Sequence, residues 1–191
     1  HQPVVKHRVY VPTWAQRERL EYTSLLAQIL SELLDGEPDE TVGSISPLPL
    51  GWPSELASGE LLDRCGNQLR QLATNLKEVE AKTGRRVVVA IEPEPGCQLD
   101  TTDDVINWFE RELPEETHRR YLTVCHDICH SAVMMEPQAE VLDRLANADI
   151  AIGKVQVSSA IVADWQSMAE DRRREAIKQL REFAEDRYLH Q

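Results

Sequence analysis

The sequence predicts an α/β fold of alternating strands and helices, present as a partial (β/α)8 (TIM) barrel of about five to six βα units. Apolar runs typical of buried parallel strands alternate with amphipathic stretches along the chain. The expected strand ends fall near Ser46, Glu92, Asp127, Gln156 and His190, and from Glu92 onward they lie 29 to 35 residues apart. A barrel of ~250 residues allots about 31 residues to each unit, so this spacing suits a barrel. An open doubly wound sheet is the alternative, because five strands do not close an eight-stranded barrel.

The chain begins with an extended segment and a helix. Residues 4–11 are expected to be extended, and Thr13 with Gln16 is expected to form a capping box that starts a helix ending near Leu34. One face of this helix is apolar at helical spacing, which predicts that it is the buried face. Its residues are Tyr22, Leu25, Leu26, Ile29 and Leu33.

The later elements follow from the same patterns. A short strand within 41–49 leads into a proline-rich loop, and a long helix over 59–83 ends at Gly84, a residue suited to a helix C-cap. The run VVVAI (87–91) predicts a strand buried on both faces. The remaining expected elements are a helix over 101–113, a strand over 121–127, a helix over 137–145, a strand over 150–159, a charged helix over 165–185 and the start of a strand at 187–191.

The composition narrows the classes of partner. The 191 residues are enough for one domain, residues 1–191, and they carry a net charge of −12 with no basic run, so no nucleic-acid partner is expected. No apolar run approaches the ~20 residues of a membrane helix, so no direct membrane span is expected. The four cysteines show no CxxC spacing, which predicts reduced thiols and a cytoplasmic protein. A small-molecule metabolite is the expected partner, and the sequence leaves the oligomeric state open.

Two glutamates stand directly after the predicted central strand. Glu92 and Glu94 alternate with Pro93 and Pro95, and each proline fixes its own φ and pushes the preceding residue towards extended geometry. Both carboxylates are therefore held stiffly at the carboxyl end of a core strand, which is where α/β folds place ligands and chemistry. The alternative is a strand end whose polar residues simply enter a loop.

The other predicted strand ends add further polar groups at the same mouth of a barrel. Asp127 and His130 follow the strand over 121–127, and Lys154 and Gln156 end the strand over 150–159. Carboxylate, amide and imidazole groups together suit a divalent metal ion such as Mn²⁺, Mg²⁺, Co²⁺ or Zn²⁺. We therefore expect Glu92, Asp127 and Gln156 to converge on one ion. Such an ion polarises a carbonyl while a carboxylate moves the proton.

Each of these residues also has an alternative interpretation. Asp127 fits a helix N-cap, and His130 fits a surface histidine. Cys125 and Cys129 fit buried thiols, or a zinc site shared with the histidines. Lys154 fits a Schiff-base lysine, or an ion pair with a carboxylate at a neighbouring strand end.

The motifs EPEPG (92–96), CHDICH (125–130) and GKVQ (153–156) together resemble the xylose isomerase-like barrel superfamily, which includes sugar-phosphate isomerases and epimerases. That resemblance implies that Glu92 is a metal ligand and the proton-transfer carboxylate, that Asp127 is a second ligand, and that His130 contacts substrate. Gln156 stands where that superfamily usually has a metal-binding histidine.

Within that superfamily, longer motifs resemble the metabolite-traffic proteins of the Ebo operons. The motifs are VYVPTW (9–14), GSISPLPLGW (43–52), GKVQVSSA (153–160) and YLHQ (188–191). The resemblance implies that the chain, which begins at His1 without Met, is an internal piece of a longer barrel.

Two functions are expected from these observations. The first is a metal-dependent sugar or sugar-phosphate isomerase or epimerase acting on a small cytoplasmic metabolite, with Glu92, His130 and Lys154 as catalytic residues. The alternative is a non-catalytic or divergent metabolite-traffic protein that handles a small molecule for export. A third hypothesis, a nuclease acting on abasic DNA, is disfavoured by the net charge of −12.

Overall fold

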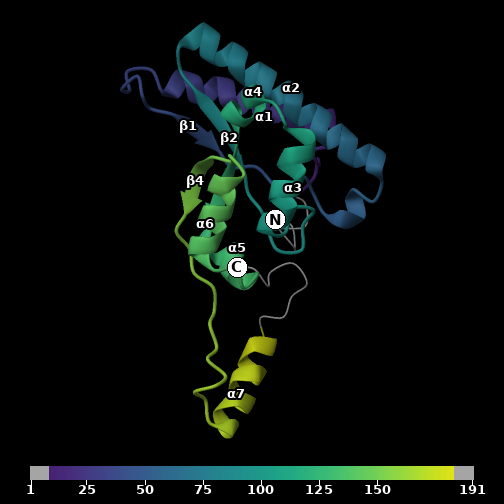
Figure 1. Ribbon diagram of the computed structural model, residues 1–191, viewed down its shortest axis with the longest axis vertical. Helices are drawn as coiled ribbons and strands as arrows, with labels where there is room; N and C mark the ends of the chain where they lie inside the picture. The colour runs from purple at the N-terminus through teal and green to yellow at the C-terminus, as the bar shows by residue number, and fades with distance from the viewer. Residues whose placement is uncertain (1–8, 183–191) are drawn as a thin grey trace, which may run out of the picture.

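Four strands form one parallel sheet (Figure 1). The computed structural model describes residues 9–182. The strands lie side by side in the order β1-β2-β3-β4, and their bounds are β1 (Gly43–Ile45), β2 (Val87–Ile91), β3 (Leu122–Asp127) and β4 (Ile152–Gln156). All three pairings are parallel, so the carboxyl ends of the four strands lie at one edge of the sheet.

The prediction of a partial TIM barrel with five to six βα units is wrong for residues 9–182. That part of the chain contains four strands, in a sheet with β1 and β4 at its edges. The charged helix predicted after β4 is α7 (Glu170–Arg181), and none of its residues is buried, so it does not complete another unit packed on the sheet (Figure 1). The spacing of the apolar runs indicates how many strand-like segments the sequence has, but it does not show which of these segments pair in a sheet. The strand predicted at 187–191 lies outside the described residues.

β2 lies inside the sheet, between β1 and β3. All five of its residues are buried, which confirms the predicted burial on both faces. Val87, Val89 and Ile91 belong to the hydrophobic core that the strands share with the helices. β-Branched side chains suit this position because they pack well on a pleated surface and lose little additional rotamer freedom there.

The pairing of β4 with β3 contains a register shift at Gly153. Val124 lies opposite Ile152 and Cys125 lies opposite Lys154, so Gly153 is the extra residue. A Cβ atom at Gly153 would collide with the Thr123 side chain, whose own Cβ would be only 3.0 Å away. The missing side chain therefore lets β4 approach β3 closely enough to pair.

The first helix buries a different face from the one predicted. α1 (Arg17–Leu33) buries Leu20, Thr23, Ala27 and Ser31. The expected apolar face is turned outward: Tyr22, Leu25, Ile29 and Leu33 are 55, 54, 46 and 72% exposed. Small side chains on the buried face let α1 lie close to the long helix beside it (Figure 1). The predicted capping box at Thr13 is wrong, because the N-cap of α1 is Gln16 and no side chain caps the helix there. The Thr13 amide does donate to Gln16 Oε1 over 2.8 Å, in the turn before the helix.

The second helix, α2 (Gly59–Thr83), has the predicted bounds. Its amino end is capped by Ser58, whose hydroxyl accepts a hydrogen bond from the Leu61 amide. Gly84 follows it in the left-handed region with φ of 70°, as the C-cap prediction requires. Its apolar stripe contributes Leu69, Leu72 and Leu76 to the core.

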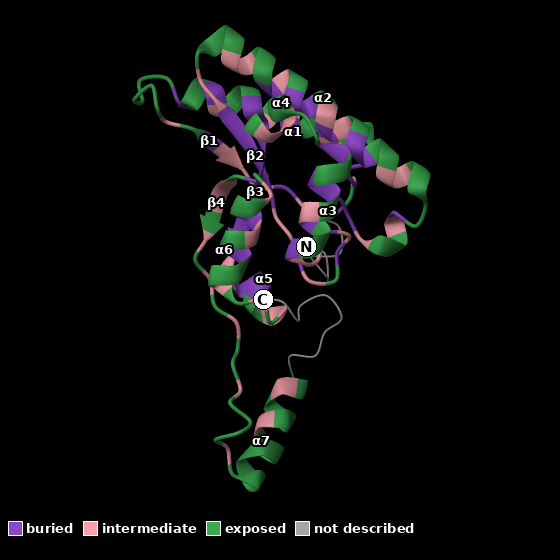
Figure 2. Cartoon of the chain, viewed as in Figure 1, coloured by how far each residue is buried: buried purple, intermediate pink, exposed green. Residues whose placement is uncertain are grey.

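Shorter helices complete the fold. They are the 3-10 turn η2 (Pro53–Glu55) and the helices α3 (Thr102–Glu112), α4 (Glu116–Tyr121), α5 (Ile128–Val133) and α6 (Gln138–Asn147). α3 begins with a full capping box between Thr101 and Asp104. Figure 2 shows that burial is concentrated in the sheet and the helices packed on it, whereas the segment after β4 and α7 are mostly exposed.

The four cysteines are free and buried, in line with the reduced thiols expected. Within residues 9–182, each helix is too short or too polar to cross a lipid bilayer.

Candidate functional site

Polar side chains follow each of the four strands at the carboxyl edge of the sheet. Ser46 follows β1, Glu92 follows β2, Asp127 ends β3 and Gln156 ends β4. Because neighbouring parallel strands end at the same edge, residues far apart in the chain meet there. This edge is the candidate site.

Glu92 links three of the strand ends. Its Oε2 accepts a hydrogen bond from the Ser46 hydroxyl over 2.6 Å, and its Oε1 accepts one from the Gln156 amide nitrogen over 2.6 Å. The side chain is 21% exposed, so it is open to a ligand on one side only. Glu92 is thus held in one orientation by neutral donors from β1 and β4.

His130 stands beside Glu92. Its Nδ1 lies 3.7 Å from Glu92 Oε1 and 3.0 Å from the Pro93 carbonyl oxygen. Since a carbonyl oxygen only accepts hydrogen bonds, the contact with Pro93 requires a proton on Nδ1 and leaves the lone pair of the neutral ring on Nε2. His130 is buried, which removes the alternative of a surface histidine.

Asp127 performs the helix-cap role that the sequence left open. Its Oδ1 accepts a hydrogen bond from the Cys129 amide over 2.9 Å, at the start of α5, and another from the Ser158 hydroxyl. Burial raises the pKa of Asp127, but the hydrogen bonds from Ser158 and Cys129 and the nearby His130 outweigh it and hold the pKa below its ordinary value. The group is therefore a carboxylate at neutral pH.

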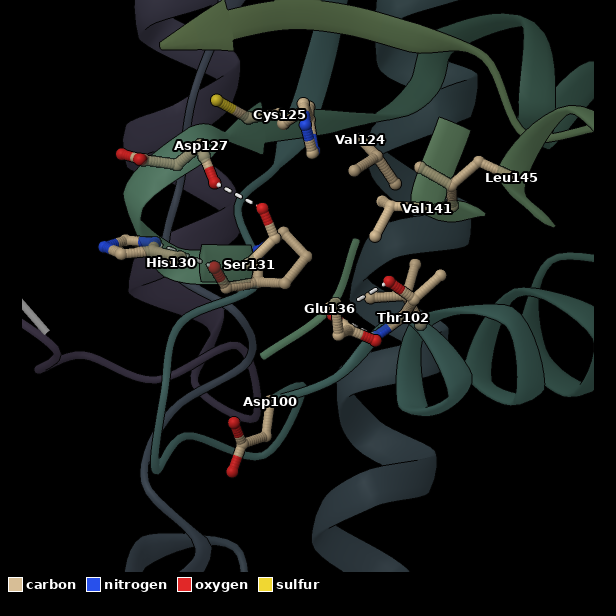
Figure 3. Close-up of a pocket in the computed structure, with 13 residues that line it drawn as sticks. Asp100, Thr102, Val124, Cys125, Asp127, His130, Ser131, Glu136, Val141 and Leu145 are labelled. Carbon is tan, nitrogen blue, oxygen red and sulfur yellow. Dashed lines mark hydrogen bonds between the residues drawn. The ribbon is translucent and has the colours of Figure 1, made fainter. Parts of the chain in front are cut away.

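Three side chains here offer a set of metal donors. One ligand atom each from Asp127, Cys129 and His130 lie within 4.8 Å of one another. Figure 3 shows the Asp127 carboxylate and the His130 ring extending to the same side, away from Val124 and Leu145.

The donor chemistry of this set fits a metal ion. A His130 ring whose Nδ1–H donates to a backbone carbonyl has the usual arrangement of a metal-ligating histidine. Oxygen, nitrogen and sulfur donors together favour Zn²⁺ or Co²⁺ over Mg²⁺. Burial raises the pKa of the Cys129 thiol, so a metal would have to displace its proton.

The three metal ligands expected from the sequence are Glu92, Asp127 and Gln156. Glu92 and Gln156 are in contact, and Gln156 pairs with Asp127 across the β3–β4 ladder. Gln156 turns its amide nitrogen, a donor, towards Glu92, and Asp127 is bonded to Ser158. The compact set of donors joins Asp127 to Cys129 and His130, so the shared residue of the two sets is Asp127.

Lys154 lies next to the site but forms no ion pair within the part of the chain that the structure describes. It pairs with Cys125 across the ladder. Burial raises the pKa of the Cys125 thiol, and the Glu92 carboxylate raises it further, while the nearby Lys154 ammonium opposes both. Lys154 thus adds positive charge near Cys125.

The second predicted glutamate, Glu94, is buried and has a separate partner. Tyr10 donates its hydroxyl proton to the Glu94 carboxylate, and burial together with this contact raises the pKa of Tyr10. Tyr10 also packs edge-on against Trp52, with ring centroids 4.9 Å apart. Tyr10 and Glu94 thus join the loop before α1 to the loop after β2.

Two hollows adjoin the strand ends. A cavity of about 30 Å³ lies behind β3, between Asp127, His130, Ser131 and Val141, and it has room for a water molecule only (Figure 3). A groove of about 360 Å³ lies beside β1 and β2, and its wall includes Tyr10, Arg19, Ser46, Glu92 and Glu94. Only the groove has the size of a small-molecule site.

Several residues of this site were not singled out from the sequence. Ser46, Ser158, Tyr10 and Arg19 reach it from loops or from the start of α1. Serine and tyrosine are common on surfaces, and no spacing connects them to Glu92. The one available signal was the position of Ser46 directly after a predicted strand.

The chain was compared with family models, curated proteins and solved structures, and matches were found among the solved structures. No family model matches the chain, and no curated protein matches it. Among solved structures it is similar to apo 3-keto-D-glucoside 4-epimerase from E. coli, with 14% sequence identity, a TM-score of 0.45, and coverage of 87% of this chain and 73% of that chain. A TM-score of 0.45 at 14% identity does not establish a shared fold or a shared function.

The resemblance to the xylose isomerase-like superfamily, and within it to the metabolite-traffic proteins, does not stand. Neither a family model nor a curated protein supports it, and residues 9–182 form a four-stranded sheet in place of the five to six units implied. Of the motifs that suggested it, EPEPG is the loop that follows β2, and GKVQ makes up most of β4. Such short motifs do not separate one parallel α/β fold from another.

Proposed function

We propose that the protein is a metal-dependent isomerase or epimerase that acts on a small polyhydroxylated carbonyl compound, such as a sugar. One observation carries the proposal: Glu92, in the wall of a groove of about 360 Å³, lies 3.7 Å from His130 of the metal-donor set. A carboxylate base beside a metal-donor set, in a groove of ligand size, is the arrangement that proton transfer next to a carbonyl requires.

Glu92 is the proposed base. It takes a proton from the carbon next to the substrate carbonyl, and the C–H electron pair moves toward the carbonyl oxygen. Isomerisation results when the proton returns to the former carbonyl carbon and the proton of the adjacent hydroxyl passes to the former carbonyl oxygen. Epimerisation results when a donor on the opposite face, such as water, protonates the original carbon. A divalent ion held by Asp127, Cys129 and His130 would supply the positive charge that polarises the carbonyl.

Other groups support this role for Glu92. Each of its oxygens accepts one hydrogen bond, which orients the carboxylate and leaves lone pairs that can take a proton. A substrate hydroxyl entering the groove can replace Ser46, because Ser46 lies in the groove wall with Glu92. Lys154 is the cation proposed to balance charge beside Glu92.

The test is deuterium incorporation at carbon. The full chain is loaded with Zn²⁺, Co²⁺, Mn²⁺ or Mg²⁺ and incubated in D₂O with a panel of aldoses and ketoses, and the loss of C–H signals is followed by proton NMR. The Glu92→Gln variant is expected to lose incorporation by about 10²–10⁴-fold while it still binds metal. Asp127→Asn is expected to lose metal uptake, and Glu110→Gln, an exposed carboxylate on α3, serves as the control. Incorporation that is unchanged in Glu92→Gln would refute the role of Glu92.

A second candidate function is binding of such a metabolite without turnover. The double hydrogen bonding of Glu92 favours it, because a carboxylate whose two oxygens are both engaged is suited to accept ligand hydroxyls in their place. Saturable binding of a sugar by the metal-loaded protein, with no deuterium incorporation, would select this function over the isomerase.

A further inference from the structure

We propose that Arg19 binds the anionic group, a carboxylate or a phosphate, of the polyhydroxylated ligand in the groove beside β1 and β2. The proposal rests on the proposed function only in taking this groove as the ligand site. It narrows the ligand to a hydroxy acid or a phosphorylated polyol, with the anion at Arg19 and the hydroxyls at Ser46 and Glu92.

The Arg19 guanidinium is fixed by the backbone. Its Nε donates to the Pro12 carbonyl over 2.7 Å, and its Nη2 donates to the Val9 carbonyl over 3.2 Å. Five N–H groups are present on a guanidinium, so three remain, distributed over Nη1 and Nη2. Two N–H groups on these neighbouring nitrogens match the two oxygens of a carboxylate or a phosphate.

The positive charge of Arg19 has no carboxylate partner within ion-pairing distance anywhere in residues 9–182. Two other arginines do have one: Arg70 pairs with Glu112 over 2.9 Å and Arg120 pairs with Glu80 over 2.6 Å. Arg119 resembles Arg19, since it donates to the Leu113 and Ala148 carbonyls without a carboxylate partner among the described residues, but it does not line the groove. Arg19 is half-buried, and burial lowers its pKa. A partly desolvated cation without a counter-ion is a favourable place for an anionic ligand group.

The other charges of the groove give the ligand a direction. Glu92 and Glu94 line the same groove and repel an anion, so the anionic group is expected to lie at Arg19. Hydroxyl groups, which donate hydrogen bonds, suit the carboxylate end. A neutral sugar would satisfy that end and leave Arg19 without a counter-ion.

The test compares three six-carbon probes that differ in one group: glucitol, gluconate and glucitol 6-phosphate. Binding to the full chain is measured by isothermal titration calorimetry at low ionic strength. We expect gluconate or glucitol 6-phosphate to bind roughly 10 to 100 times more tightly than glucitol, as charge-assisted hydrogen bonds imply. The anion that gains more identifies the carboxylate or the phosphate as the natural group.

The variants separate the role of Arg19 from its structural contacts. Arg19→Gln is expected to bind all three probes equally weakly, whereas Arg19→Lys retains part of the preference because it keeps the charge but loses the planar fork. Arg17→Gln is the matched control, since Arg17 lies on the same helix, is exposed and is paired with Glu21. A thermal melt of each variant shows whether loss of the contacts to Pro12 and Val9 has unfolded the region, and in that event Arg19→Lys decides the outcome.

Three results would overturn the proposal: equal binding of glucitol and the anionic probes, an unchanged preference in Arg19→Gln, or no binding of any probe. None of these results depends on deuterium incorporation or on metal uptake, so they leave the proton-transfer role of Glu92 to its own test. Conversely, a Glu92→Gln variant that retains the preference for anionic probes but never incorporates deuterium supports the anion site whatever the reaction is.

Discussion

Glu112, at the end of α3, is a buried carboxylate with two arginine partners. Its Oε1 accepts a hydrogen bond from Arg111 Nε over 2.8 Å, and its Oε2 accepts one from Arg70 Nη1 over 2.9 Å. Gly66 on α2 leaves the room for it, because a Cβ atom there would collide with the Glu112 carboxylate. Burial raises the pKa of Glu112, but the hydrogen bonds and charges of Arg111 and Arg70 outweigh it and lower the pKa.

This carboxylate predicts a pH-dependent stability. Because the folded-state pKa lies below the unfolded value of about 4.5, the ionised group stabilises the fold above that pH, and the contribution is lost as pH falls through the folded pKa. Glu112→Gln is expected to lower the free energy of unfolding by about 1–3 kcal/mol at pH 7. The difference from the native chain should shrink between pH 4.5 and more acid conditions, as measured by urea denaturation. A difference that stays constant across this range would show that the charge of Glu112 contributes nothing.

The residues at the candidate site divide into those that the sequence could predict and those that it could not. Glu92, Asp127 and Gln156 stand at the ends of predicted strands, so their place at one edge follows from strand periodicity and parallel pairing. Their hydrogen-bond partners do not follow, because Ser46 and Ser158 are short polar residues whose approach depends on the path of the loops. The metal, the base role of Glu92 and the roles of His130 and Lys154 remain predictions.

At the scale of single elements, α1 shows why a helix can be predicted and its buried face mispredicted. Apolar residues of α1 lie on two faces, and the face with the more pronounced stripe, including Leu25 and Leu33, is turned outward. The face against α2 is made of small residues such as Ala27, which allow close helix packing, and Ser24 accepts a hydrogen bond from Asn75 of α2 there. Hydrophobicity alone predicts burial of the face with the large apolar residues. The face with the small residues is buried instead, because it lets α1 approach α2 closely.

Two substitutions test this orientation of α1. Ala27→Leu is expected to lower the free energy of unfolding by about 1–3 kcal/mol, because Ala27 is buried where α1 packs on α2 and a larger side chain must push the two helices apart. Leu33→Lys is expected to change it by less than about 0.5 kcal/mol, because Leu33 is exposed. Urea denaturation measures both. The reverse ranking would restore the face predicted from the sequence.

The register shift in β4 gives a second prediction for a single element. Gly153→Ala places a methyl group against Thr123 and 3.1 Å from Val88 Cγ2, so β4 must move away from β3. We expect a loss of about 1–3 kcal/mol in the free energy of unfolding. Chemical-shift changes should extend to Gln156 and Ser158 at the site. Gly59→Ala is the matched control, since a Cβ atom at Gly59 meets nothing within 4 Å. Equal stability of the two variants would contradict the close approach at Gly153.

For the whole molecule, the strand–helix alternation was predictable and the number of packed units was not. The apolar runs of β1 to β4 follow one another along the sequence, and helices and loops lie between them. The failure lies after β4, where residues 157–169 and α7 carry apolar residues such as Ile161 and Ile177 without burying them. A charged helix with isolated apolar residues has the same sequence pattern whether it packs on a sheet or stands in solvent. The sequence therefore could not show that α7 is unpacked.

The exposed apolar surface predicts self-association of the chain. The outward face of α1 and the edge strand β4, with Val155 51% exposed, both leave apolar groups in water. Light scattering and sedimentation are expected to show a mass that rises with protein concentration. The double change Leu25→Glu and Ile29→Glu should shift the chain towards the monomer. A monomer that persists at about 100 μM, a concentration at which contacts of modest affinity form, would contradict this prediction.

The contrast between β2 and β4 has a consequence for how the site opens. β2 is buried throughout and paired on both sides, whereas β4 has no buried residue and pairs only with β3. Amide hydrogen exchange in β2 should therefore require global unfolding, while β4 exchanges through a local opening of lower free energy. Such an opening withdraws Gln156 from Glu92 and leaves the Ser46 contact in place. The fluctuations of one weakly held strand would then set how often Glu92 has an unengaged oxygen.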